Sequence, residues 1–255
     1  MSPRIPVFVI NLDRSPERLA KIRKRAEEIG IDLIRVRAVD GAQLTPEHSQ
    51  KVDHASFARD HGKRILPAEI GCYLSHLDAL QIVADSPESH AVIVEDDVQF
   101  NPDFLAFLDD LVALEGWDVV KLVNHRTRGF VSHAKVNDRY QIGRCAHGPC
   151  GSSAAYMVTR QGAGRLLAAL NPMGLPYDVA LERGWAGGYE LFSTDQPVVR
   201  LSPEMGSTIF VGESPYRKAT FPAHKRLRTL LFRSRDYLRR IRFALASTRL
   251  RRRQA

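Results

Sequence analysis

The stretch HAVIVEDDVQF, residues 90–100, constrains the fold of this chain more than any other. Four apolar-leaning residues, 91–94, run directly into Glu95, Asp96 and Asp97. Because apolar and polar residues do not alternate there, we expect a strand that is buried on both faces, as in a parallel sheet. Proteins with such sheets bind ligands at the carboxyl ends of their strands. The pattern therefore predicts an α/β fold that brings three carboxylates to one edge of a mostly parallel central sheet.

The sequence before this stretch agrees with that fold. Residues 7–12 predict a buried strand, residues 15–30 a helix that Ser15 and Pro16 begin and Gly30 ends, and residues 32–40 a second strand. Residues 41–66 are polar and predict an irregular, mobile loop with a helical turn after Thr45 and Pro46. The same patterns predict further helices at 66–86, 102–114 and 160–170, and further strands at 118–123, 153–159, 189–193 and 196–202.

The composition is that of an ordinary globular protein, with 255 residues of which 44% are hydrophobic and 26% charged. The cysteines Cys72, Cys145 and Cys150 show neither a CxxC pair nor a paired metal-ligand spacing. We therefore expect reduced thiols in a cytosolic compartment, with a Cys145–Cys150 bridge as the alternative. Apolar runs fall short of the ~20 residues of a membrane span. The amino terminus does not have the pattern of a signal peptide, so we expect a cytoplasmic protein.

Positive charge is concentrated in the last 32 residues. Residues 224–255 carry 12 Lys and Arg against one acid, whereas residues 1–223 carry 25 basic and 28 acidic residues. We expect a domain over 1–223 and a basic tail over 224–255. The tail predicts an amphipathic helix whose apolar residues recur every three or four positions, namely Leu227, Leu230, Leu231, Leu238, Ile241 and Leu245.

Such a basic amphipathic helix is typical of a segment that lies in the plane of an anionic membrane surface. This favours a peripheral protein on the inner face of the cytoplasmic membrane. Packing of the stripe on the domain or on a second subunit is the structural alternative. A nucleic-acid-binding tail is the third, and the apolar stripe disfavours it.

Three adjacent carboxylates repel one another unless a cation neutralises them. A hard divalent ion with oxygen ligands, Mg²⁺ or Mn²⁺, suits Glu95, Asp96 and Asp97, and such ions commonly bind substrate phosphates as well. A sugar-nucleotide diphosphate and other phosphate esters both fit this description. A solvated loop after a strand is the alternative reading of the triplet.

Three blocks together resemble glycosyltransferase family 25, the lipooligosaccharide glycosyltransferases and their collagen-galactosylating relatives. The blocks are VFVINLDRSPER, LPAEIGCYLSHLDAL and VIVEDDVQF, and they occur in that order within the first ~100 residues. A looser similarity continues to about residue 183. The resemblance implies a GT-A-like nucleotide-sugar-binding fold and transfer of a sugar, galactose in many members, from a UDP-sugar to a glycolipid or oligosaccharide.

The resemblance also implies roles for the triplet, which corresponds to the Asp-x-Asp motif of such enzymes. Asp97 is then the best metal ligand and Glu95 the next, while Asp96 orients them or the donor sugar.

The other two blocks supply further donor-binding candidates. Asn11, Asp13 and Arg14 close the first strand, where a nucleotide would lie, and Arg14 suits a phosphate or the base. Glu69 and His76 belong to the second block, where His76 is either a site residue or a structural histidine. For Arg18 two interpretations are equally open, a site residue and a residue on a solvated helix face.

Inversion at the anomeric carbon would need a carboxylate that deprotonates the acceptor hydroxyl from the side opposite the leaving group. The metal-binding acids cannot do this, so the candidates are Asp178, Glu182 and Asp195. Asp178 is preferred because PYDVALE predicts a helix start beside a loop, although a capping role for Asp178 is equally open.

The sequence leaves two other classes of function. One is a metal-dependent phosphoester hydrolase, which the lack of a His-rich metal motif disfavours. The other is a non-catalytic protein that binds membrane or nucleic acid through its tail.

Overall fold

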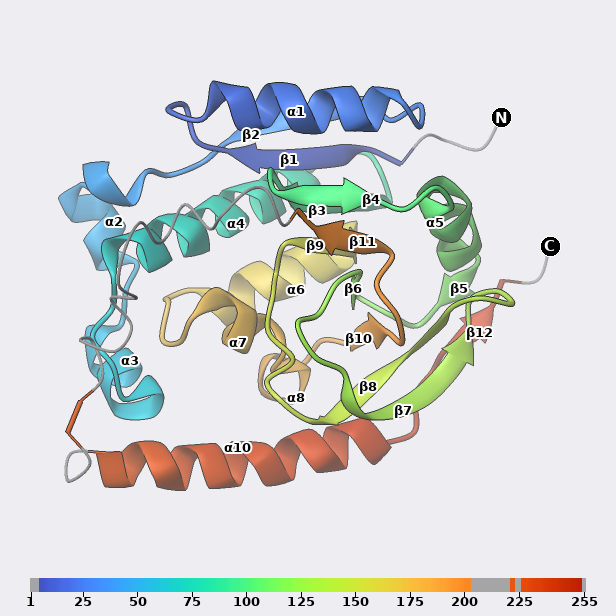
Figure 1. Ribbon diagram of the computed structural model, residues 1–255. Coiled ribbons are helices and arrows are strands. Elements are labelled where there is room, and N and C mark those ends of the chain that lie inside the picture. Colours follow the sequence, from blue (N-terminus) through green and yellow to red (C-terminus); the bar gives the residue numbers. More distant parts are fainter. Residues whose placement is uncertain (1–4, 203–220, 223–225, 254–255) are drawn as a thin grey trace.

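The computed structural model describes residues 5–202, 221–222 and 226–253. Its centre is an eight-stranded sheet with the order β2-β1-β3-β9-β6-β10-β8-β7 (Figure 1). The pairings set β8 and β9 antiparallel to their neighbours, so the other six strands point in one direction. The predicted α/β fold with a mostly parallel sheet is confirmed. The strands are β1 Val7–Asn11, β2 Leu33–Arg37, β3 His90–Glu95, β6 Val119–Lys121, β7 Arg128–Lys135, β8 Gln141–His147, β9 Ala155–Thr159 and β10 Leu191–Thr194.

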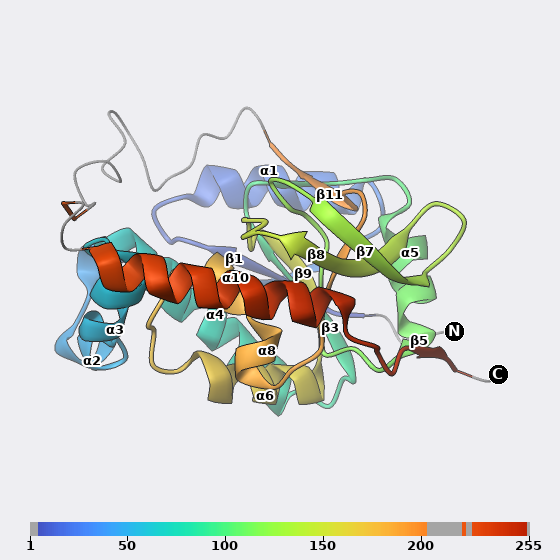
Figure 2. The ribbon, with the colours of Figure 1, turned by 90° about the horizontal axis from the view of Figure 1, so that it is seen from below.

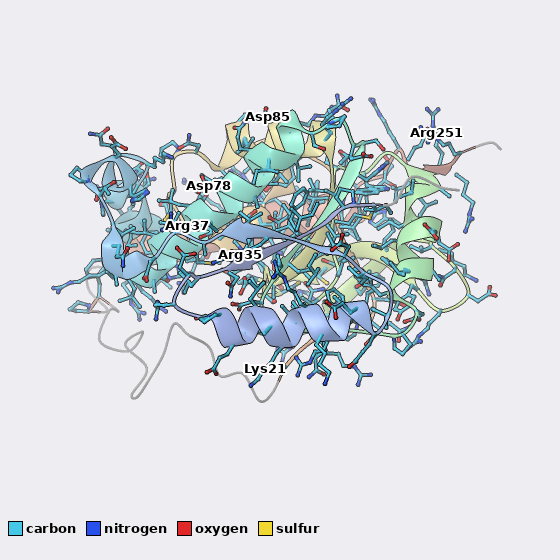
Figure 3. All side chains as sticks on the ribbon, turned by 90° about the horizontal axis from the view of Figure 1, so that it is seen from above. Lys21, Arg35, Arg37, Asp78, Asp85 and Arg251 are labelled. Atoms are coloured by element: carbon cyan, nitrogen blue, oxygen red, sulfur yellow. The ribbon has the colours of Figure 1, made fainter. Side chains whose placement is uncertain are left out.

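The chain opens with β1, helix α1 (Pro16–Glu27) and β2, as predicted. Alternate residues of β1 pack into two hydrophobic cores on opposite faces of the sheet. Val9 packs with Ile22 of α1, whereas Phe8 packs with Leu74 of α4 (Pro67–Asp85) on the opposite face. Figure 3 shows α1, which carries Lys21, and α4, which carries Asp78 and Asp85, on the two sides of these strands. Both faces of β1 are therefore buried.

The remaining helices complete a three-layer arrangement. Helix α5 (Phe104–Val112) lies in the same core as α1, while α6 (Arg160–Leu170) lies in the core of α4. The short helices α7 (Tyr177–Leu181) and α8 (Gly184–Gly187) follow α6. Two small sheets pair β4 (Val98–Phe100) with β11 (Val199–Leu201) and β5 (Leu114–Glu115) with β12 (Arg251–Arg252).

Within residues 41–66, the predicted helical turn after Thr45 and Pro46 is confirmed, whereas the prediction that the rest is an irregular loop is wrong. This segment forms a 3-10 turn, η1 (Gly41–Gln43), and the helices α2 (Pro46–Gln50) and α3 (His54–His61). Local capping explains α3, because the Asp53 carboxylate accepts from the Ser56 backbone N at 2.9 Å and Gly62 ends the helix at φ 74°. Such short helices have too few apolar residues to produce a periodic pattern.

The basic tail forms the helix α10 (Leu227–Leu245), which runs across the outside of the molecule and packs on β8 and α3 (Figure 2). The packed face buries Thr229, Arg240 and Ala244. The predicted apolar stripe faces elsewhere, since Leu231 and Leu238 are 52% and 58% exposed. Packing and an exposed stripe therefore coexist. Among the described residues, no helix combines the length and apolar character that crossing a membrane needs.

Helix α4 approaches the segment after β2 so closely that Gly71 has no room for a side chain. A Cβ there would lie 2.5 Å from the Val39 carbonyl oxygen and 2.8 Å from the Gly41 backbone N. We expect Gly71→Ala to lower the free energy of unfolding by about 2 kcal/mol through overpacking. Urea denaturation measures this change.

The matched control for Gly71→Ala is Gly164→Ala in α6, where a Cβ would meet nothing within 4 Å. That substitution should raise stability by about 0.5 to 1 kcal/mol, because alanine loses less conformational entropy in a helix than glycine does. Equal effects of the two variants would contradict the close approach of α4.

Candidate functional site

Two adjacent cavities meet at the carboxyl end of β3, and both are lined by Cys72, Glu95 and Asp97. The first, here called the donor cavity after the donor-binding residues that the sequence predicts there, lies between α1, the segment after β2, and α4. The second, here called the acceptor cavity because it is lined by the predicted base Asp178, has a volume of about 420 Å³, within the usual range of ligand sites. The donor cavity is also lined by Arg14, Arg18, Val39, Gly41, His76 and Asp96, and the acceptor cavity by Glu69, His125, Ser152, Ser153, Tyr177 and Asp178.

Protein donors occupy both oxygens of the Asp96 carboxylate. Asn11 Nδ2 donates to Oδ2 at 2.7 Å, and the Arg18 guanidinium lies 2.5 Å from Oδ1. Burial raises the pKa of Asp96, although the hydrogen bond from Asn11 and the charge of Arg18 oppose this. Asp96 therefore orients Arg18 within the site.

Within the triplet, Asp97 is the acid whose burial is least offset by hydrogen bonds and positive charge. Its Oδ1 is buried and has no hydrogen-bond partner among the residues that the structure describes, while its Oδ2 lies 3.5 Å from Arg18. Burial, followed by the charge of Glu95, raises the pKa of Asp97 to about 7. An unpartnered buried carboxylate oxygen is a position that a bound cation would satisfy.

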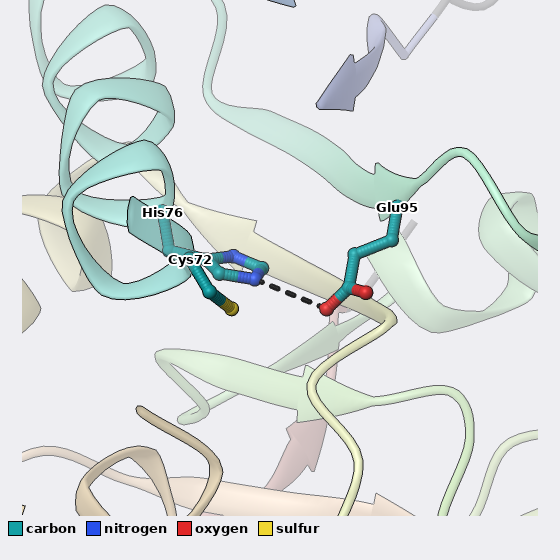
Figure 4. Close-up of side chains that lie close together, drawn as sticks. All are labelled: Cys72, His76 and Glu95. Atoms are coloured by element: carbon teal, nitrogen blue, oxygen red, sulfur yellow. Dashed lines mark hydrogen bonds and ion pairs between the residues drawn. The ribbon is translucent and has the colours of Figure 1, made fainter. Parts of the chain in front are cut away.

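His76 of α4 holds the Glu95 carboxylate (Figure 4). His76 Nε2 lies 3.3 Å from Glu95 Oε1, and its Nδ1 lies 3.1 Å from the Tyr156 hydroxyl. The imidazole also stacks on Tyr177 at a centroid distance of 4.1 Å. Burial would raise the pKa of Glu95, but the hydrogen bond and charge of His76 outweigh it and lower the pKa. These contacts fix where the carboxylate points.

Two sets of candidate metal ligands share Glu95. Glu95 and Asp97 offer the oxygen ligands that Mg²⁺ and Mn²⁺ prefer. The ligand atoms of Cys72, His76 and Glu95 lie within 4.8 Å of one another, a set that suits Zn²⁺. Burial and the charge of Glu95 raise the pKa of the Cys72 thiol well above its ordinary value.

Asp178, in the first turn of α7, lines the acceptor cavity. Its Oδ1 accepts from the Val179 backbone N at 2.9 Å. Burial, followed by the negative charge of Glu182, raises its pKa. The carboxylate therefore has both a cavity in front of it and increased basicity.

The structure assigns the other two base candidates to structural contacts. Glu182 is 2% exposed and accepts from Lys121 Nζ at 2.7 Å and from Arg240 Nη1 at 2.9 Å. Asp195 Oδ1 accepts from the backbone N of Gln141 at 3.0 Å, which ties the end of β10 to β8. Neither carboxylate suits proton transfer.

The remaining predicted site residues divide between the cavities and the surface. Arg14 lines the donor cavity and pairs with Asp40 at 2.9 Å. Glu69 lines the acceptor cavity and accepts from the Leu66 backbone N at 2.8 Å. Asn11 lies beneath Asp96. Asp13 is half exposed and pairs with Arg35 and Arg37, which Figure 3 labels on β2, outside the cavities.

Sequence reasoning undervalued Arg18 and missed His125, Ser152 and Ser153. The position of Arg18, one turn into the helix after the first strand, was the available signal for a side chain that turns back to the strand end. The serines follow a segment without periodicity, so their place beside Glu95 depends on tertiary contacts. Ser153 Oγ lies 3.4 Å from Glu95 Oε1.

A mostly parallel α/β sheet with acidic side chains at its carboxyl edge, between two cavities, defines a GT-A-like protein. The family described as glycosyltransferase family 25 (LPS biosynthesis protein) matches residues 4–181. The chain belongs to glycosyltransferase family 25.

Curated relatives include both a galactosyltransferase and an inactive protein. A glycosyltransferase 25 family member of Aedes aegypti is 28% identical over 172 residues, 63% of this chain and 27% of that protein. Procollagen galactosyltransferase 2 of Homo sapiens is 25% identical over 183 residues, 68% of this chain and 29% of that protein. Inactive glycosyltransferase 25 family member 3 of Mus musculus is 29% identical over 178 residues, 64% of this chain and 28% of that protein. The chain thus matches less than a third of the length of these relatives.

Proposed function

We propose that the protein is a metal-dependent glycosyltransferase that transfers a sugar, galactose in the first instance, from a UDP-sugar to a glycolipid or lipooligosaccharide acceptor. The observation that carries the proposal is that two cavities share Glu95 and Asp97. A transferase must hold a donor and an acceptor side by side, and it must stabilise the leaving diphosphate between them. Family membership supports the reaction class, and the similarity to the human procollagen galactosyltransferase supports galactose as the sugar.

The donor cavity supplies contacts for an anionic group. Within the described part of the chain, Arg18 Nε is buried without a hydrogen-bond partner, and Arg18 and Arg14 both line this cavity. Guanidinium groups suit phosphate oxygens because they donate in pairs. We assign Glu95 and Asp97 to hold Mn²⁺ or Mg²⁺, which when bound would neutralise charge on the leaving diphosphate. Asp96 and Asn11 hold Arg18 in place.

The acceptor cavity supplies the base. We assign the Asp178 carboxylate to accept the proton of the acceptor hydroxyl as that oxygen attacks the anomeric carbon. Attack from this cavity, with the diphosphate leaving on the Glu95 and Asp97 side, gives inversion. Ser152, Ser153 and His125 line the same cavity and would orient the acceptor.

The proposal is tested by a screen of UDP-sugars with Mn²⁺, Mg²⁺, Zn²⁺ or EDTA, with UDP release and product formation both measured. Transfer that requires Mn²⁺ or Mg²⁺ supports the oxygen ligand set. Activation by Zn²⁺ alone would move the ion to Cys72, His76 and Glu95. Release of phosphate from simple esters without sugar transfer would replace the proposal by a hydrolase.

We also propose that α10 places the enzyme on the inner face of the cytoplasmic membrane. Residues two apart lie about 200° apart around a helix, so Leu238 points away from Asp236 and Arg240, which face the domain. The exposed leucines are flanked by the exposed arginines Arg228, Arg235, Arg239 and Arg242. An apolar stripe beside guanidinium groups complements an anionic lipid surface.

Leu231→Ser together with Leu238→Ser should weaken binding to vesicles that contain phosphatidylglycerol by about 30-fold. Each leucine is expected to contribute about 1 kcal/mol when part of its surface leaves water. Sedimentation with vesicles measures the affinity. The control is Ile82→Ser with Leu105→Ser, two exposed apolar residues on α4 and α5. Unchanged binding of the α10 variant would remove the membrane assignment.

A further inference from the structure

A buried charged cluster lies behind the acceptor cavity and joins three distant parts of the chain. Lys121, at the end of β6, is fully buried, and its Nζ lies 2.7 Å from Glu182 Oε1. Arg240 of α10 places Nη1 2.9 Å from Glu182 Oε2. Two cations thus surround one carboxylate in the interior, an arrangement in which losing one partner is costly.

The Glu182 side chain also holds the segment 149–153 through hydrogen bonds from the backbone of that segment. Its Oε2 accepts from the Cys150 N and its Oε1 from the Gly151 N, both at 2.9 Å. Lys121 Nζ donates to the Gly151 carbonyl oxygen at 3.0 Å. Ser152 adopts φ 65°, a left-handed conformation that a non-glycine residue keeps only when its surroundings fix it.

The same segment forms one wall of the acceptor cavity. Ser152 and Ser153 line that cavity, and the Ser153 hydroxyl reaches Glu95 at 3.4 Å. A continuous path of contacts therefore runs from Arg240 through Glu182 and the backbone of Cys150 and Gly151 to Glu95.

Arg240 is built into this position from several sides. A Cβ at Gly148 would lie 2.6 Å from Nη1, so the guanidinium rests against the glycine backbone. Its carbon Cζ lies 5.1 Å from the ring centroid of Trp185. Burial would raise the pKa of Glu182, but the charges of Lys121 and Arg240 outweigh it and lower the pKa. Arg240 is thus one of the two cationic side chains that contact the Glu182 carboxylate.

We propose that Arg240 is a positioning residue for the acceptor side of the site, acting through Glu182 on the segment 149–153. The effect on transfer rests on the proposed function, whereas the effect on the segment does not. The helix that carries the exposed leucine stripe thereby also sets the geometry of the cavity wall.

The test compares Arg240→Gln with Asp236→Asn. Asp236 lies one turn earlier on the same face of α10 and pairs with Arg183 at 3.0 Å, so it ties the helix to the domain without contacting Glu182. The first readout is labelling of the buried Cys150 thiol by N-ethylmaleimide, mapped by peptide mass spectrometry. The second is steady-state transfer, with kcat and the KM for donor and acceptor measured separately.

Arg240→Gln should increase Cys150 labelling by about tenfold, because the segment opens locally more often. The variant should lower kcat for transfer by about tenfold and leave the donor KM within twofold, since the donor cavity keeps its residues. Asp236→Asn should change neither readout. Gly148→Ala, which displaces the guanidinium, should reproduce the labelling increase.

Equal labelling of Cys150 in the Arg240 and Asp236 variants would overturn the proposal, since both would then act only by loosening α10. Unchanged labelling in Arg240→Gln would overturn it as well. Absence of transfer by the wild-type protein would count against the proposed function and leave the labelling comparison valid.

Discussion

Asp97→Asn should lower the rate of sugar transfer by about 100-fold to 1,000-fold, the range typical of losing one group that stabilises charge in the transition state. The substitution keeps the shape of the side chain and removes its charge. Asp97 Oδ1 is buried and lacks a partner among the described residues, so the substitution removes the charge that we propose a cation would neutralise. The concentration of Mn²⁺ that gives half-maximal transfer should rise together with the loss of rate.

Initial rates over a Mn²⁺ titration measure both effects. Asp195→Asn is the matched control, because Asp195 accepts backbone hydrogen bonds at the end of β10 rather than in either cavity. A variant of Asp97 that transfers sugar at the wild-type rate, with the same Mn²⁺ dependence, would exclude it as a metal ligand.

Asp178→Asn should lower kcat for transfer by about 10² to 10⁴, the usual contribution of a general base. Donor binding should persist, because Asp178 lies in the acceptor cavity while Arg14 and Arg18 lie in the donor cavity. Calorimetric titration with UDP and Mn²⁺ measures donor-site binding directly. Weakened UDP binding in this variant would instead give Asp178 a role on the donor side.

The pH dependence gives a second test of the same carboxylate. A base acts in its deprotonated form, so transfer should fall as the pH decreases through the pKa of Asp178. That pKa lies above its ordinary value of 3.8 because of burial and the neighbouring Glu182 charge. The acid limb of the kcat profile should therefore lie above pH 3.8 and disappear in Asp178→Asn. An acid limb that persists unchanged in the variant would assign it to another group.

The elements that the sequence predicted are those whose signals are local. Helix α4 follows from apolar residues at helical spacing, and β3 from an uninterrupted apolar run, so both lie within one residue of their predicted bounds. The hairpin of β7 and β8 was not predicted because β8 carries Arg144 in its centre. Arg144 is buried in part beneath α10, as its Nη1 donates to the Phe243 carbonyl oxygen at 2.8 Å.

The candidate site likewise combines residues that local sequence patterns predict with residues that only tertiary contacts bring together. The triplet was predictable because its acids are consecutive and follow a buried strand. The role of Glu182 was not, because its partners Lys121 and Arg240 are 61 and 58 residues away. A single sequence gives no measure of such pairings. The leucine stripe of α10 was visible in the sequence, but its orientation away from the domain required the packing of the opposite face.

The separation of Glu182 and Arg240 also has a consequence for biosynthesis. A ribosome adds about 5 to 20 residues per second, so Glu182 is made several seconds before the arginine 58 residues later. During that interval Lys121 is the only member of the cluster that can neutralise it. If the docking of α10 completes the wall of the acceptor cavity, the nascent chain acquires its donor side first. Competence for transfer would then arrive with the same helix that we propose to contact the membrane.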